Sequence, residues 1–154
     1  MHLAILMTNI DESNFSAQWP KDGAKFAGLV ALVRPAWRFT VFSVKDGEFP
    51  EDIGAFDGTI ITGSPASVTD DMPWVAQLMG VIREAVAKGL RASLKTGSLI
   101  TGALYVDLDY YQDDAPGELG KSGDYLTLPT VSSGFAQLEA RISNLFDRLE
   151  AIPL

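Results

Sequence analysis

Residues 58–65 read Gly58-Thr59-Ile60-Ile61-Thr62-Gly63-Ser64-Pro65, a short apolar run closed by glycine, serine and proline. Such a run is typical of a strand. Residues 3–8 form an earlier continuous apolar run, as expected of a strand buried on both faces, and residues 39–44 form another run that is rich in aromatic and β-branched side chains. The sequence therefore predicts three strands.

Helical patterns follow the first and third of these runs. Residues 21–33 carry apolar side chains at helical spacing, and Pro35 should end that helix. A second helix should begin near Asp70 or Asp71, either of which can cap it, with Pro73 in its first turn. Gly89 should close it. The expected apolar stripes are Phe26, Leu29, Val30 and Val33 in the first helix, and Val75, Leu78, Met79, Ile82 and Val86 in the second.

The order strand, helix, strand, turn-rich loop, strand, helix predicts an α/β fold with a parallel sheet and right-handed crossovers. Residues 1–89 should form a three-layer fragment of this kind. In such sheets the functional crevice lies at the carboxyl ends of the strands. We expect that crevice at residues 8–11 and 63–67.

The pattern changes after Gly89, so we predict a second segment over residues 90–154. Residues 90–95 and 103–109 alternate apolar and polar side chains, which predicts a half-solvated antiparallel hairpin. Residues 112–130 show no regular period. A final helix should begin near Gly134, with a heptad-like apolar seam that could pack in a core or against a partner: Leu138, Ile142, Leu145, Leu149 and Ile152.

Composition excludes several classes of function. The formal charge of −8 and the pI near 4.5 argue against a nucleic-acid surface. The chain has no cysteine, so it has no disulfide, no thiolate metal site and no cysteine nucleophile. No run of about 18 apolar residues is present, and the apolar N-terminus lacks a basic leader. We expect no membrane span and a cytoplasmic location.

The best candidate site is the turn Gly63, Ser64 and Pro65 after the third strand. Glycine there lets backbone N–H groups approach a ligand, which suits an oxyanion pocket. The alternative is a plain turn between strand and helix. A serine nucleophile is disfavoured because Ser64 and Ser67 lie outside a G-x-S-x-G elbow, and because His2 starts the opposite end of the sheet.

Two weaker patterns are expected to carry no site. Residues 117–122 imitate the end of a phosphate loop, but the required earlier glycine is Ala115 and no helix should follow. Asp107 and Asp109 share one face of a strand, with Asp113 and Asp114 nearby. They could hold a calcium ion, but a solvated strand face explains them better. We therefore expect no metal and no cofactor.

Residues 1–89 resemble the N-terminal half of a class I glutamine amidotransferase-like domain, which has a flavodoxin-like fold. Residues 2–9, 56–68 and 70–74 carry the resemblance. It implies that the turn Gly63, Ser64 and Pro65 supplies part of an oxyanion hole. It also implies a cysteine nucleophile, followed later by a histidine and a glutamate. This chain has no cysteine and no histidine after His2, so we expect no glutaminase activity.

Residues 90–154 resemble the paraquat-inducible protein B branch of the bacterial mammalian-cell-entry (MCE) domain family. The resemblance rests on residues 89–108, 128–131 and 151–154. It implies the end of a small β-barrel and the start of lipid-conducting helices. The chain is thus expected to be a fusion of two fragments, with lipid transport or binding as the alternative function. A join without biological role is a third possibility. Exposed sheet edges, or the helix from Leu138 to Ile152, could mediate self-association.

Overall fold

The computed structural model describes residues 1–97, 102–111 and 117–131. Its contacts divide the chain into two compact units, Met1–Val81 and Ile82–Leu154. The boundary between these units lies inside the second helix, a few residues before Gly89. The join that we predict after Gly89 stays a prediction.

The first unit contains the expected parallel sheet. Its strands are β1 (His2–Leu6), β2 (Arg38–Phe42) and β3 (Gly58–Ile61), in the order β2-β1-β3. All three predicted strands are confirmed, each ending two residues earlier than the apolar pattern. The mixed α/β class is confirmed as well.

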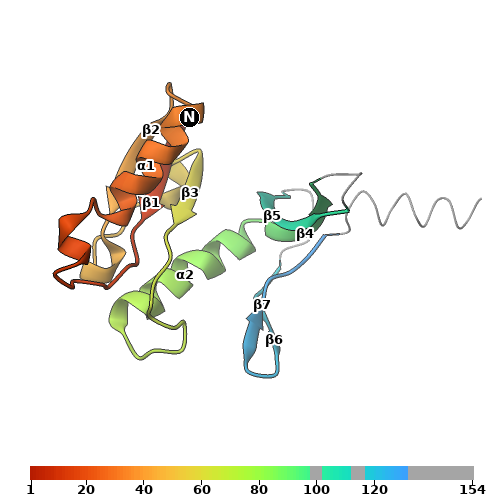
Figure 1. Cartoon of the computed structure of the whole chain (residues 1–154). Helices are drawn as coiled ribbons and strands as arrows, with labels where there is room; N and C mark the ends of the chain where they lie inside the picture. Colours follow the sequence, from red (N-terminus) through yellow and green to blue (C-terminus); the bar gives the residue numbers. More distant parts are fainter. Residues whose placement is uncertain (98–101, 112–116, 132–154) are drawn as a thin grey trace, which may run out of the picture. The chain divides into compact units, whose positions relative to one another are not determined.

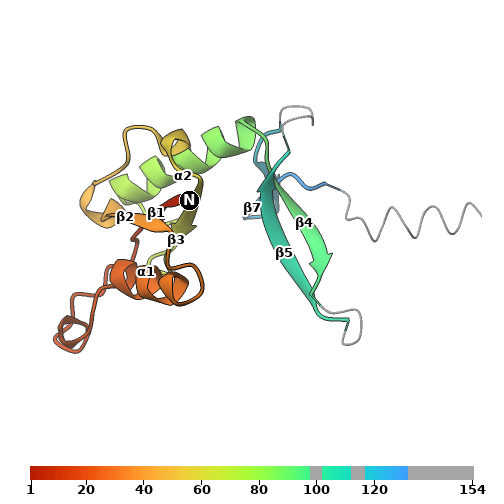
Figure 2. The same ribbon diagram turned by 90° about the horizontal axis from the view of Figure 1, so that it is seen from above.

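Only the central strand is buried along nearly its whole length. Leu3, Ala4, Ile5 and Leu6 of β1 are at most 7% exposed, whereas Val41 of β2 and Ile61 of β3 are 41% and 45% exposed. The burial expected for the strand at residues 3–8 is therefore confirmed for β1, and the two outer strands are only partly buried. Of the three described strands of this sheet, β1 is the one with a neighbouring strand on each side. Helix α1 (Asp22–Val33) and the part of helix α2 that belongs to the first unit (residues 73–81) lie on opposite sides of this sheet (Figure 2).

Helix α1 (Asp22–Val33) connects β1 to β2, and it ends two residues before Pro35 as predicted. The Arg34 N–H donates to the Val30 carbonyl and closes its last turn. The predicted apolar stripe is only partly covered, because Leu29 and Val33 are 62% and 66% exposed. The amino-terminal turn lies closest to the sheet: a Cβ on Gly23 would stand 2.4 Å from Cγ1 of Val41.

Gly23→Ala should therefore destabilise the first unit by about 1–2 kcal/mol, because the new methyl would overlap Cγ1 of Val41 and crowd its Cγ2. The matched control is Gly28→Ala in the same helix, where a Cβ would meet nothing within 4 Å. That change should stabilise the protein by about 0.5–1 kcal/mol through helix propensity. Urea unfolding of both variants measures the difference. Equal effects would contradict the close approach of α1 to β2.

Between β2 and β3 the chain forms only two short 3-10 turns, η2 (Val44–Asp46) and η3 (Ile53–Ala55). A third, η1 (Ser16–Gln18), precedes α1. Val44 is fully buried and adds to the core directly after β2. The turn-rich connection predicted between these strands is thereby confirmed.

Helix α2 (Pro73–Ala87) begins at the predicted proline and buries Val75, Leu78 and Val86 of the predicted stripe. The residue before it is Met72, so neither Asp70 nor Asp71 occupies the N-cap position. Asp70 instead accepts a hydrogen bond from the Ser67 N–H at 2.8 Å and closes the preceding turn. Gly89 follows the helix with φ of +109°, a conformation that favours glycine. No helix in the described stretches is long and apolar enough to cross a membrane.

The second unit contains the predicted hairpin. Strands β4 (Leu90–Thr96) and β5 (Leu104–Tyr110) pair antiparallel, with Ala92 opposite Leu108. Figure 1 also shows a smaller hairpin, β6 (Gly120–Ser122) and β7 (Tyr125–Thr127), around Gly123 at φ of +60°. This smaller hairpin lies within residues 112–130, where the sequence shows no regular period. The predicted C-terminal helix lies outside the described residues.

The exposure of side chains in the β4–β5 hairpin differs from the expected alternation of buried apolar and exposed polar residues. Arg91 and Ser93, polar residues of the alternation, are only 3% and 4% exposed, whereas Val106 is 65% exposed. The Arg91 guanidinium turns back to the end of α2, where it donates to the Val86 carbonyl at 2.8 Å. It also lies against Gly117, where a Cβ would be 2.9 Å from its Cζ. These contacts with Val86 and Gly117 account for the burial of Arg91, which the alternation places among the solvated residues.

Candidate functional site

The carboxyl ends of β1 and β3 are joined by two buried hydroxyl side chains. Thr8 and Thr62 are 3% and 5% exposed. The Thr8 N–H donates to Oγ1 of Thr62 at 3.0 Å, and Oγ1 of Thr8 donates to the Thr62 carbonyl at 2.6 Å. The hydroxyl groups thus continue the hydrogen-bond ladder beyond the last paired residues, Leu6 and Ile61. They fix the start of the loop after each strand.

The predicted oxyanion turn begins at this junction. The Gly63 carbonyl lies 3.3 Å from Oγ1 of Thr8, as a minor second acceptor of the proton that this hydroxyl donates to the Thr62 carbonyl. A Cβ on Gly63 would meet nothing within 4 Å, so no described neighbour requires glycine there. Oγ of Ser64 accepts from the Ala66 N–H at 3.1 Å and is engaged within the turn, as expected of a structural serine. Pro65 is exposed between them.

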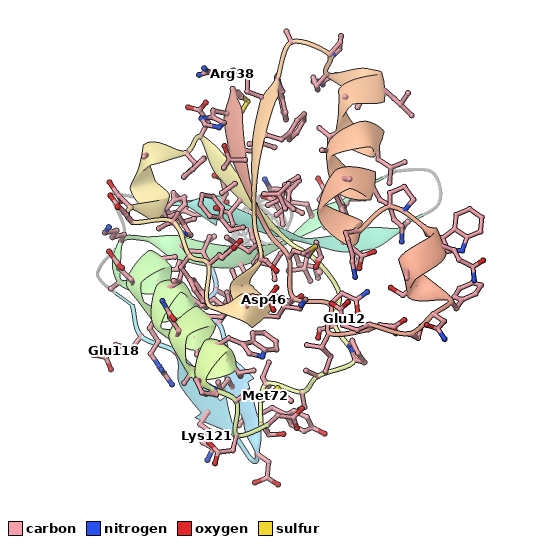
Figure 3. The ribbon with its side chains drawn as sticks, turned by 90° about the vertical axis from the view of Figure 1, so that its left-hand side faces the viewer. Glu12, Arg38, Asp46, Met72, Glu118 and Lys121 are labelled. Carbon is pink, nitrogen blue, oxygen red and sulfur yellow. The ribbon has the colours of Figure 1, made fainter. Side chains whose placement is uncertain are left out.

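A chain of charged groups lies at the same edge of the sheet. Lys45, directly after β2, contacts Asp46 at 2.9 Å and Glu12 at 3.0 Å, and Glu12 also contacts Lys21 at 2.9 Å. Figure 3 shows Glu12 and Asp46 close together, at the opposite end of the sheet from Arg38. The hydrogen bond from Lys21, with that from Lys45, lowers the pKa of Glu12. Asp46, with Glu12, raises the pKa of Lys45.

A further pair ties the loop after β1 to the start of α1. The Asn9 side-chain amide donates to Oδ2 of Asp22 at 2.7 Å, and Lys25 contacts the other oxygen at 3.1 Å. The hydrogen bond from Asn9, and then that from Lys25, lowers the pKa of Asp22 below its ordinary value of 3.8. Asp22 also lies in the first turn of α1, where a negative charge is favoured.

Asp22→Asn should lower the melting temperature at neutral pH, with a deficit that shrinks as the pH falls below about 3.8. Folding lowers the pKa of Asp22, so its contribution is complete above the unfolded-state value and is lost as pH falls through the folded-state value. Thermal unfolding of wild type and variant from pH 7 to pH 2 measures it. Asp71→Asn, at an exposed position, is the control. A deficit for Asp22→Asn that is constant with pH would contradict the assignment.

Sequence reasoning located part of this edge and missed the rest. It named residues 8–11 and 63–67, and the structure brings Thr8 and Thr62–Gly63 together. It missed Lys45 and Asp46, which lie at the end of β2. The rule that parallel strands end at one edge would have included them. Their pairing with Glu12 depends on the course of the loop between β1 and α1, for which no local pattern exists.

The one histidine lies away from this edge. His2 opens β1, where its Nε2 stands 2.8 Å from Oγ1 of Thr40 and its ring packs on Phe56. Ser64 and Ser67 follow the other end of the sheet. The expectation that His2 lies at the opposite end of the sheet from these serines is therefore confirmed.

The structure also shows where the phosphate-loop-like segment and the aspartate-rich strand lie. Gly120, Lys121 and Ser122 form strand β6, and strand β7 follows, so the phosphate-loop reading is rejected as expected. Asp107 contacts Lys95 on the neighbouring strand. In the part of the chain that the structure describes, no group of three or more His, Asp or Glu side chains is placed to hold a metal ion. Asp113 and Asp114 lie outside the described residues.

Comparison with known proteins leaves the family open. No protein-family model matches the chain, and no solved structure matches it. The site is therefore interpreted from its own geometry and from the resemblances in the sequence.

Proposed function

We propose that residues 1–89 form a catalytically inactive, flavodoxin-like fragment of the class I glutamine amidotransferase type, which binds a small amide or carboxylate without hydrolysing it. The observation that carries this proposal is the position of Gly63. It leaves β3 directly beside the end of β1, held there by Thr8 and Thr62.

The strand order supports the proposal. The order β2-β1-β3 equals the first three positions of the flavodoxin-like order, in which the chain reverses its direction of growth between β1 and β3. Ligands of open α/β sheets bind outside the carboxyl ends of the strands at that reversal. Thr8, Thr62 and Gly63 occupy this place.

The chemistry of the residues favours binding over hydrolysis. Glutamine hydrolysis by the amidotransferase route needs a thiolate to attack the side-chain amide, and the chain has no cysteine. The open space around Gly63 leaves its backbone accessible. A glycine turn that no neighbour requires suits a ligand that approaches the backbone closely.

The test combines ammonia release from glutamine with an NMR titration of the full chain with glutamine and glutamate. We expect no ammonia above the buffer rate and saturable shifts of the Gly63 and Ser64 amide signals. Gly63→Val should abolish the shifts while the melting temperature stays near that of wild type, since a Cβ there meets open space. Ammonia release would refute inactivity. A titration without shifts at Gly63 would show the turn to be only a connection.

A second candidate is lipid binding by the MCE-like segment, and the exposed apolar face of the β4–β5 hairpin favours it. Four side chains share that face and are 48–65% exposed: Leu94, Leu104, Val106 and Leu108. Lipid extraction and mass spectrometry of the purified chain test this candidate. Stoichiometric lipid that is lost in Val106→Asp would favour it, and lipid-free protein would exclude it.

A further inference from the structure

The outer edge of β5 carries backbone groups that no described residue pairs. The Gly97 N–H donates to the Ala103 carbonyl, and the Tyr111 N–H donates to the Gly89 carbonyl. Because bonded pairs alternate along an antiparallel ladder, Tyr105, Asp107 and Asp109 direct their peptide groups to β4. The N–H and C=O groups of three residues therefore point away from β4: Leu104, Val106 and Leu108.

The opposite edge of the same sheet is already occupied. On β4 the Ala92 N–H donates to the Pro129 carbonyl, and the Ala92 carbonyl accepts from the Val131 N–H, both at 3.0 Å. The edge of β5 that no described residue pairs also has a defined end. The Asp109 carboxylate accepts from the outward Tyr110 N–H at 2.8 Å, so an added strand could not pair with that donor.

We propose that the chain forms a two-fold dimer by antiparallel pairing of β5 with β5 of a second copy, centred on Val106. In this register Val106 lies opposite Val106 of the second copy, and Leu104 lies opposite Leu108. Each of these pairs exchanges both of its backbone hydrogen bonds. A free, apolar edge strand is a ready template for such pairing.

Charge disfavours the registers that are shifted from this one toward the end of β5. Centring the two-fold axis on Asp107 would place Asp107 opposite its own copy, and centring it on Leu108 would place Asp107 opposite Asp109. Like charges directly opposite each other destabilise a sheet. Centring the axis on Val106 places Asp107 opposite Tyr105 and uses only donors that remain free. The proposal concerns the second unit and does not depend on the function proposed for the first.

The first experiment measures self-association of the full chain by sedimentation equilibrium. Val106→Pro removes an outward N–H and leaves the β4–β5 bonds in place, so the dimer dissociation constant should rise by about tenfold or more. Val106→Thr is the control: it keeps the N–H and the β-branched shape, and it should dimerise like wild type. A wild-type chain that stays monomeric, or a Val106→Pro chain that dimerises equally well, would overturn the proposal. So would loss of the dimer in Val106→Thr, which would indicate packing through the apolar face instead.

The second experiment reads the register and does not depend on the proline variant folding. Because the chain has no cysteine, single cysteines can be introduced and oxidised. Val106→Cys should cross-link rapidly, since directly opposite residues lie within disulfide range. Leu108→Cys, on the same exposed face, should cross-link at least about tenfold more slowly, because its copies would be about 13 Å apart along the strands. Equal rates, or faster cross-linking of Leu108→Cys, would overturn the register.

Discussion

Ile5→Ala is expected to lower the free energy of unfolding of the first unit by about 2–5 kcal/mol, the largest single effect of any substitution considered for this chain. Ile5 is fully buried on the central strand, paired with Val41 on one side and Ile60 on the other. The truncation deletes buried apolar groups, whose transfer from water stabilises the fold. It also leaves a cavity, which cannot close because β1 is hydrogen-bonded to a strand on each side. Urea denaturation measures the loss, and amide exchange of β1 assigns it to this unit.

The matched control is Ile61→Ala, on the outer strand of the same sheet. Ile61 is 45% exposed, so the same truncation should cost less than about 1 kcal/mol. Equal losses for the two variants would mean that β1 is not the centre of the core. That result would also remove the structural basis of the candidate site, since β1 positions Thr8.

Thr62→Val is expected to destabilise the first unit by about 2–3 kcal/mol although it keeps the shape of the side chain. The substitution removes the oxygen that accepts the Thr8 N–H at 3.0 Å. Both residues are at most 5% exposed, so water cannot replace the lost acceptor easily. A buried donor without a partner costs more than a typical hydrogen bond contributes. The same change should broaden the NMR signals of Gly63, whose carbonyl depends on Thr8.

Thr59→Val on the same strand is the control, because Thr59 is exposed and a valine there favours the strand. It should leave stability within about 0.5 kcal/mol of wild type. A double-mutant cycle with Thr8→Val then isolates the coupling between the two hydroxyl groups. Additive effects would contradict the junction, since hydrogen-bonded partners should show a coupling free energy of at least about 0.5 kcal/mol.

Local sequence patterns were sufficient to predict the ends of helices and the pairing of a hairpin, because there a single residue type or a simple alternation determines the backbone conformation. Pro73 fits the first turn of a helix because the N–H it lacks is not needed there. Pro35 cannot continue a helix, and α1 ends two residues before it. The alternation in residues 90–95 and 103–109 predicted the β4–β5 hairpin because a strand directs successive side chains to opposite faces.

The small hairpin of β6 and β7 had a signal that the composition obscured. Gly123 adopts φ of +60° between the two strands, as a tight hairpin turn requires. The surrounding residues are acidic, and the paired strands are short and fully exposed. A strand without a buried face has no apolar period, so the usual pattern for strands was absent.

The sequence by itself determined the order of the helices and strands from β1 to β5, the absence of thiolate chemistry and the position of Gly63 after a strand. The order of the elements and the position of Gly63 follow from local sterics, and the absence of thiolate chemistry follows from the absence of cysteine. Only the tertiary structure decided that β1 lies between β2 and β3, that Thr8 therefore meets Thr62, and that Glu12 reaches both Lys21 and Lys45. It also buried Arg91 and exposed Val106. These outcomes depend on which distant segments come together. The free energy of burying or pairing a side chain depends on both partners, so neither sequence position predicts it alone.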